Sequence, residues 1–108
     1  MNNQTIECEN YLDDDGRPAG GRVDGVGIHI SWQNGPLGRG DDRLEPNGAF
    51  VETVLRAAQQ RIEHYNASGF ACRENSLAIT KIEEALHWLG ARTARREAQG
   101  VEGTHAGS

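Results

Sequence analysis

Hydrophobic and polar positions repeat with different periods in the two halves of the chain. Apolar residues alternate with polar ones from Val26 to Trp32. This period of two predicts a strand with Val26, Ile28, Ile30 and Trp32 on one face. The turn signal Asn-Gly-Pro at 34–36 closes this strand.

The rest of the first 45 residues is rich in glycine and aspartate and has no helical pattern. The segment 5–11 is a second candidate strand. Asp-Asp-Asp-Gly at 13–16 indicates a turn, and Pro18 and Gly20-Gly21 are interpreted as further breaks. The segment 37–46 is interpreted as a polar loop with room for another short strand. These signals together favour a small antiparallel sheet.

The second half has a helical period. The first apolar stripe, spaced three or four residues apart, consists of Phe50, Val51, Val54, Leu55, Ala58, Ile62 and Tyr65. Asn47 is the predicted N-cap of this helix, and 66–69 ends it. The stripe of the second helix consists of Ala78, Ile82, Ala85, Leu86 and Leu89, with Trp88 near its edge. This helix is predicted to follow residues 72–76 and to stop near Gly100.

The sequence therefore predicts an α+β fold, a small N-terminal antiparallel sheet followed by a two-helix antiparallel hairpin. The expected divisions are an N-terminal β region over 1–45, a helical hairpin over 46–100 and a Gly-rich tail over 101–108. Only 36% of the residues are hydrophobic and 6% aromatic, so the core of one molecule is thin. We expect the chain to assemble as a homo-oligomer, because small domains bury little surface alone.

Charge narrows the classes of partner. The formal net charge is −5, yet residues 53–108 hold six acids and seven bases, and ten of the eleven basic residues are arginine. An acidic chain with one arginine cluster argues against binding polymeric nucleic acid, but a small anion can dock locally. The absence of a long apolar run or secretion signal, and two distant cysteines, lead us to expect a cytoplasmic protein without a membrane partner.

The arginine cluster is the first candidate site. Arg92 and Arg96 are four residues apart and share a helix face, with Arg95 on the flank. Three guanidinium groups within two turns suit an anion such as phosphate. Alternatively, Glu97 and Glu102 compensate them at a solvated helix end, which spacing alone favours.

Three other positions each allow two interpretations. Asn75 is an N-cap or, about four to five turns from Arg92, a ligand contact completed by another copy. Tyr65 ends the core stripe or stacks on a base. Thr104, between glycines, lies in a disordered tail or in a backbone concavity for phosphate.

The sequence offers no support for catalysis. The four histidines lack metal-ligand spacing, no serine has the context of a nucleophile triad, and no nucleotide-binding glycine fingerprint is present. We therefore expect a non-enzymatic protein with no catalytic residue, metal or cofactor.

From Ile28 onward the sequence resembles the phage anti-Thoeris sponges and the related anti-CBASS cyclic-oligonucleotide sponges, which share a helical hairpin. The matching segments are Trp32-Gln33-Asn34-Gly35-Pro36, Asn47-Gly48, Phe70-Ala71-Cys72-Arg73-Glu74-Asn75, Glu84-Ala85-Leu86 with Leu89, Arg92-Thr93-Ala94-Arg95-Arg96-Glu97 and Gly100-Val101-Glu102-Gly103-Thr104-His105. They are spread over about three quarters of the chain, from Ile28 to His105.

The resemblance implies a dimer or hexamer that sequesters cyclic ADP-ribose isomers without degrading them. By similarity, Asn75, Arg92 and Arg96 hold this ligand and Tyr65 stacks on its adenine. A further family arginine lies in the N-terminal half, where Arg39 and Arg43 are the candidates. Arg95 or Arg96 with Thr104 resembles a separate site for cyclic trinucleotides.

The leading hypothesis is thus a phage anti-defence sponge that captures a glycocyclic ADP-ribose signal in the cytoplasm of the infected bacterial host. Cyclic trinucleotides are the candidate second ligand. The sponge would block activation of Thoeris or CBASS effectors. The alternatives are a hydrolase or lyase acting on such nucleotides, with His64 or His105 in an acid-base pair, and a nucleic-acid-binding helical hairpin.

Overall fold

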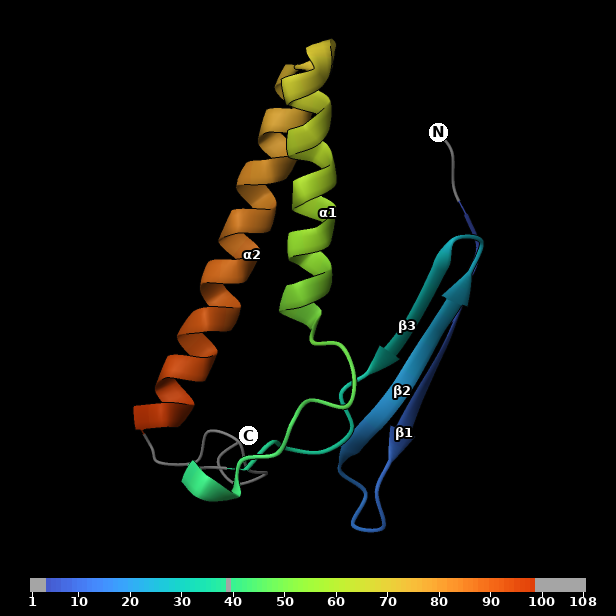
Figure 1. Cartoon of the computed structure of the whole chain (residues 1–108), viewed down its shortest axis with the longest axis vertical. Coiled ribbons are helices and arrows are strands. Elements are labelled where there is room, and N and C mark those ends of the chain that lie inside the picture. Colours follow the sequence, from blue (N-terminus) through green and yellow to red (C-terminus); the bar gives the residue numbers. More distant parts are fainter. Residues whose placement is uncertain (1–3, 39, 99–108) are drawn as a thin grey trace. The chain divides into compact units, whose positions relative to one another are not determined.

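The computed structural model describes residues 4–38 and 40–98. Three strands are followed by two helices, which confirms the predicted α+β fold (Figure 1). The chain divides into two compact units, one up to Phe50 and the other from Val51. We describe each unit by itself, as the sheet unit (residues 4–50) and the hairpin unit (residues 51–98).

The sheet unit contains three antiparallel strands, β1 (Ile6–Leu12), β2 (Pro18–Gly25) and β3 (Ile28–Trp32), in the order β1-β2-β3. Both connections are tight. The backbone nitrogen of Asp13 donates to the Arg17 carbonyl between β1 and β2, and Gly27 provides a positive φ of 76° between β2 and β3.

The central strand β2 was not predicted, because Pro18 and Gly20-Gly21 looked like breaks. That interpretation was wrong. Pro18 is the first residue of the strand, where a missing backbone N–H is tolerated. Gly21 is required by the close approach of β1, since a Cβ atom there would lie 2.5 Å from the Glu9 carbonyl oxygen. The glycines thus allow neighbouring strands to meet.

Apolar burial in the sheet unit is small. Val23, in the middle of β2, is 7% exposed. On β3 the side chains of Ile28, Ile30 and Trp32 are half-buried, and the alternate residues are exposed, as predicted. Val26 was expected on the same face, but it lies in the β2–β3 turn and is 79% exposed.

Hydrogen bonds of Asn47 hold the loop that follows β3 in a closed conformation. The Asn47 side chain accepts a hydrogen bond from the Asn34 backbone nitrogen (2.8 Å) and donates one to the Asn34 carbonyl (3.0 Å). The Asn47 backbone nitrogen donates to Oε1 of Gln33 (2.9 Å). The predicted N-cap role of Asn47 is therefore wrong, because its side chain holds a turn and the helix begins four residues later, at Val51. Leu37 is buried within this loop.

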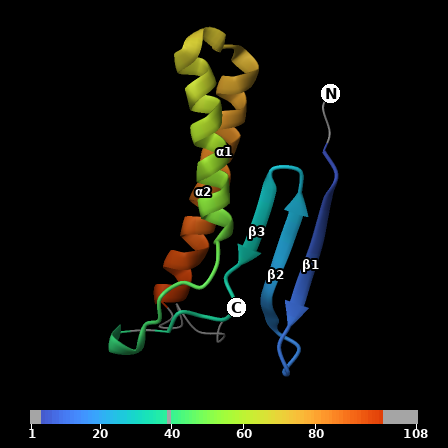
Figure 2. The ribbon, with the colours of Figure 1, turned by 45° about the vertical axis from the view of Figure 1, so that its right-hand side comes forward.

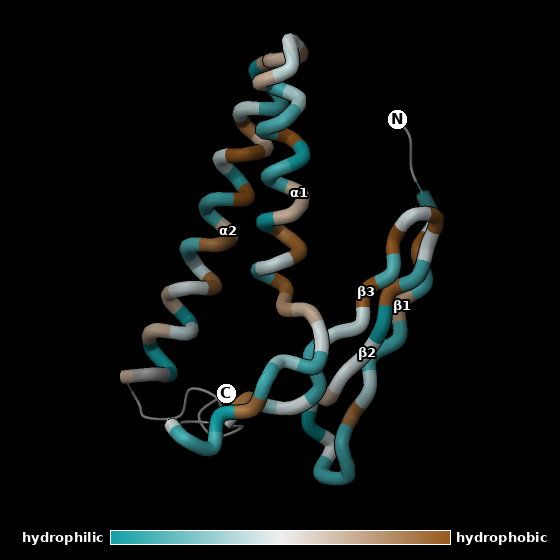
Figure 3. Tube along the Cα trace, viewed as in Figure 1, coloured by the Kyte–Doolittle hydropathy of each residue, from teal (hydrophilic) through white to brown (hydrophobic). Residues whose placement is uncertain are grey.

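The hairpin unit consists of α1 (Val51–Tyr65), a turn at Asn66–Phe70 and α2 (Arg73–Ala98). The two helices run side by side in opposite directions (Figures 1 and 2). Apolar positions recur along both of them between hydrophilic ones (Figure 3). The predicted stripe of α2 is half-buried throughout, but no described side chain of either helix is fully buried.

The helices differ in length, with 15 residues in α1 and 26 in α2. The C-terminal part of α2 therefore extends beyond the start of α1 (Figures 1 and 2). Trp88, in the second half of α2, is 70% exposed. Its apolar surface fits the self-association expected from the sequence, which stays a prediction.

Candidate ligand-binding site

The turn of the hairpin places two predicted site residues at one end of the unit. Tyr65 is the last residue of α1, and Asn75 lies in the first turn of α2. Between them the chain reverses at Gly69, whose φ of 90° suits glycine. We call this end, residues 61–75, the hairpin tip.

Asn75 is not the N-cap that spacing alone favoured. Its Nδ2 donates to the Phe70 carbonyl at 3.2 Å, so the amide closes the turn back onto itself. The backbone nitrogen of Asn75 lies 3.4 Å from Sγ of Cys72, which occupies the position before the helix. Phe70 is thereby held at the tip with its side chain 72% exposed.

Tyr65 presents an accessible ring. Its side chain is 41% exposed, more than expected for the end of a core stripe. Nε of Arg61, one turn earlier, donates to the Tyr65 hydroxyl at 3.1 Å, and the guanidinium carbon lies 5.0 Å from the ring centre. The Arg61 contact was missed in the sequence, although the four-residue spacing on one helix face was its signal.

The predicted arginine cluster lies at the other end of α2. Arg92 and Arg95 are exposed, and none of the carboxylates whose side chains the structure describes forms an ion pair with either. Arg96 is half-buried and has interactions of its own. The proposed compensation by Glu97 and Glu102 falls on groups outside the described part of the structure.

The two groups of residues do not meet in one molecule. Asn75 and Arg92 are separated by about 25 Å along α2 at 1.5 Å per residue. The structure therefore gathers Tyr65 with Asn75 at the tip and Arg92 with Arg95 and Arg96 at the far end. Thr104 and Arg39 lie outside the described residues. Arg43 belongs to the sheet unit.

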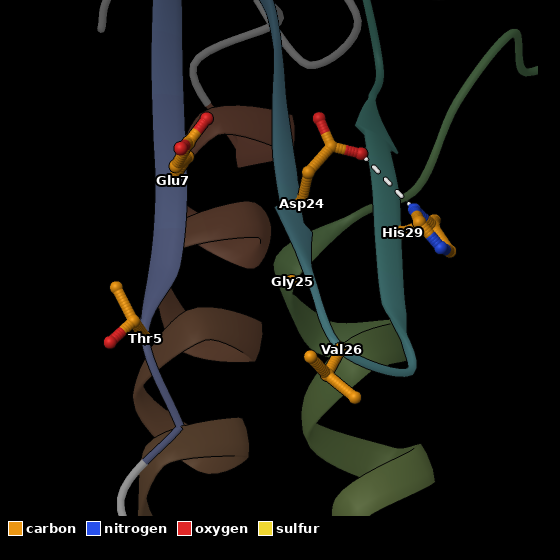
Figure 4. A pocket seen from close by; sticks show the side chains of 6 residues that line it. All are labelled: Thr5, Glu7, Asp24, Gly25, Val26 and His29. Atoms are coloured by element: carbon orange, nitrogen blue, oxygen red, sulfur yellow. Dashed lines mark hydrogen bonds and ion pairs between the residues drawn. The ribbon is translucent and has the colours of Figure 1, made fainter.

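The sheet unit has a shallow hollow on its surface. It is lined by Thr5, Glu7, Asp24, Gly25, Val26 and His29 (Figure 4). Asp24 accepts from Arg22 and also contacts Nδ1 of His29 at 3.1 Å. Because these groups pair with one another across an open surface, they have no arrangement typical of catalysis.

The described residues offer neither a metal site nor a membrane-spanning helix. No group of three or more histidine, cysteine, aspartate or glutamate side chains there can hold a metal ion. Cys8 and Cys72 are free and exposed. No helix between residues 4 and 98, as far as the structure describes them, is long and apolar enough to cross a lipid bilayer.

Comparison with known proteins identifies the family of the chain. The family model described as "Acb2/Tad1, hairpin domain" matches residues 24–94. The chain is also 52% identical over 76 residues to "Thoeris anti-defense 1" of Bacillus phage SBSphiJ7. This alignment covers 70% of the chain and 51% of that protein, so the chain spans about half the length of the relative. The matched region and the level of identity show that the chain belongs to the Acb2/Tad1 hairpin domain family.

Proposed function

We propose that this protein is a phage anti-defence sponge, which binds a glycocyclic ADP-ribose signal and keeps it from its effector without degrading it. The observation that carries the proposal is the pair of incomplete half-sites at opposite ends of α2. One end offers an aromatic ring and an amide, Tyr65 and Asn75, and the other offers exposed guanidinium groups. The name of the phage relative supports an anti-defence role.

The two half-sites complement the two parts of such a ligand. Adenine is a flat ring that stacks on an exposed tyrosine. A pyrophosphate carries two negative charges that pair with arginine forks in a bidentate manner. Each charge-assisted hydrogen bond contributes about 1.5–3 kcal/mol. Two arginines, one stacked ring and one amide are thus compatible with nanomolar capture, about −12 kcal/mol, in a preorganised site.

Assembly of several copies would complete the site. An antiparallel second copy can bring its tip beside the far end of α2 of the first, because the half-sites are at opposite ends of one helix. Exposed Trp88 and Leu77 on α2 and Val51 on α1 provide apolar surface for such packing. Burial of this surface would add stability that the thin core of one molecule lacks. In this arrangement a dimer or hexamer binds, and a monomer does not.

A sponge needs slow release and no bond-breaking chemistry. The described residues contain no group of histidine, cysteine, aspartate and glutamate side chains that could hold a metal ion, and the proposed ligand is held intact. The cytoplasm of an infected bacterium is the place where such a signal would be intercepted. Cyclic trinucleotides are a second proposed ligand, at a separate site that includes Arg95 or Arg96 and Thr104.

The proposal is tested by capture and release. Native protein is incubated with a glycocyclic ADP-ribose isomer, free ligand is removed by filtration, and the protein is denatured by heat. We expect stoichiometric recovery of unaltered ligand, identified by mass spectrometry and by reactivation of the Thoeris effector. Recovery of an altered product would indicate an enzyme, and recovery of nothing would refute the sponge.

The role of the arginine cluster is tested by substitution. Arg92→Ala should weaken binding of the same isomer about 10- to 100-fold in calorimetry, since it removes one charge-assisted pairing. Arg56→Ala is the matched control, because Arg56 is also an exposed helical arginine without an ion pair among the described residues, but lies away from both half-sites. Equal losses in the two variants would show a general charge effect instead of a site.

A further inference from the structure

Arg61 and Tyr65 form one connected group at the hairpin tip. The Arg61 guanidinium lies over the Tyr65 ring, 5.0 Å from its centre, and Nε donates to the hydroxyl at 3.1 Å. The guanidinium therefore lies near the hydroxyl edge of the ring. This contact fixes the ring through its hydroxyl group and covers part of one face.

The charge of Arg61 is not compensated. None of the described carboxylates forms an ion pair with it, and its Nη1 and Nη2 atoms have no hydrogen-bond partner among the side chains and backbone that the structure describes. Arg22 in the sheet unit behaves differently, because both of its terminal nitrogens are taken by carboxylates of Glu9 and Asp24. An exposed guanidinium with one nitrogen engaged and two available is suited to bind a phosphate.

We propose that Arg61 is a further ligand-binding residue, which pairs with a phosphate of the nucleotide whose base stacks on Tyr65. The proposal deepens the sponge function and rests on it. The base occupies the face of the ring that Arg61 leaves open, and Nη1 and Nη2 reach around the hydroxyl edge to the attached phosphate. The Arg61–Tyr65 pair thereby recognises a base and a phosphate together, and nucleosides without phosphate bind less well.

Arg61 differs from the arginine cluster because it lies in the same copy of the protein as the Tyr65 ring. Arg61 belongs to the same tip as Tyr65 and Asn75, so its position relative to the ring does not depend on a second copy. The cluster at Arg92 reaches the tip only through assembly. The ligand's phosphates are thus held by guanidinium groups from two copies, with Arg61 on the side of the base.

The test is calorimetry of the native protein and of four variants, with a glycocyclic ADP-ribose isomer and with adenosine as probes. Arg61→Gln should weaken binding of the isomer about tenfold, since one charge-assisted pairing is lost, and should leave adenosine binding within about twofold. Arg61→Lys, which keeps the charge but loses the planar fork, should fall between native and Arg61→Gln. Arg56→Gln, the matched control, should bind like the native protein.

Tyr65→Phe separates a binding role of Arg61 from a positioning role. This variant keeps the ring and removes the hydroxyl group that holds Nε. If Arg61 binds phosphate itself, the loss in Tyr65→Phe is clearly smaller than the loss in Arg61→Gln. Equal losses for both probes in the two variants would overturn the proposal, because Arg61 would then act by orienting the ring.

Two other outcomes distinguish the proposals from each other. If the native protein binds the isomer and Arg61→Gln binds it equally well, with circular dichroism showing both folded, the role of Arg61 is refuted and the sponge function stands. If the native protein binds neither the isomer nor any other cyclic ADP-ribose, the sponge function fails and this inference fails with it.

Discussion

The sheet unit and the hairpin unit use their polar side chains in opposite ways. In the sheet unit Arg22 pairs with Glu9 and Asp24, and its pKa is raised, chiefly by the hydrogen bond that it donates to Glu9. Asn47 likewise satisfies Asn34 on both its donor and its acceptor atoms. In the hairpin unit Arg61, Arg92 and Arg95 lack a carboxylate partner within the described chain.

This difference distinguishes charges that stabilise the fold from charges that are available to a ligand. Charges that pair within a unit stabilise its local geometry and leave little for an outside partner. Charges left unpaired on long helices repel one another until an anion or another chain neutralises them. The sheet unit is thus expected to tolerate loss of ligand, whereas the hairpin unit is expected to respond to it. Substitutions in the two units sharpen this contrast.

The largest effect is expected from Trp88→Glu in α2. A charge placed in apolar surface that a second copy covers would prevent assembly, because burying it without a partner is costly. Native protein should sediment as an oligomer and the variant as a monomer, with affinity for the cyclic isomer reduced at least about a hundredfold. Gln60→Glu adds the same charge at an exposed position of α1 and is the control. A native monomer with full affinity would contradict the composite site.

A smaller effect, on stability alone, is expected from Gly21→Ala in β2. The new Cβ would lie 2.5 Å from the Glu9 carbonyl oxygen, so the strands must move apart. We expect the free energy of unfolding to fall by about 1–3 kcal/mol. Urea unfolding followed by Trp32 fluorescence, in a Trp88→Phe background, reports on the sheet unit. Unchanged ligand affinity of the folded variant is expected, and a loss of affinity would show that the sheet contributes to the site.

The smallest effect has the opposite sign and comes from Gly90→Ala in α2. A Cβ atom at Gly90 meets nothing within 4 Å, and alanine is the better helix former. We expect the helix to gain about 0.5–1 kcal/mol, seen as a higher midpoint of urea unfolding by circular dichroism at 222 nm. A lower midpoint would show that another copy packs directly against Gly90.

The sequence predicted the periodic elements well and the irregular ones poorly. Both helices and β3 were found because their apolar spacing continues over many residues. The strand β2 was missed, because its Gly20-Gly21 pair shows no alternation of apolar and polar side chains. Gly21 is needed because the backbone of β1 approaches it closely, which the local sequence does not reveal. Asn47 was assigned to the wrong element for a similar reason, as its partners are thirteen and fourteen residues away.

The candidate site shows the same limit. Spacing placed Arg92 and Arg96 on one helix face and recognised that Asn75 lies too far away to join them in one molecule. It left Tyr65 as a core residue or a stacking residue, and the exposed ring in the structure fits the second use. The contact of Arg61 with Tyr65 requires side-chain conformations, which a sequence pattern does not specify.

The unequal helices have a consequence for how this protein can change over generations. Asn75 and Arg92 lie on the same uninterrupted helix, α2, so the number of residues between them fixes both their separation and their relative direction. Insertion of one residue between Asn75 and Arg92 would turn the arginines by about 100° about the helix axis relative to Asn75. The number of residues between Asn75 and Arg92 is therefore constrained, because it sets the direction of the arginines relative to Asn75.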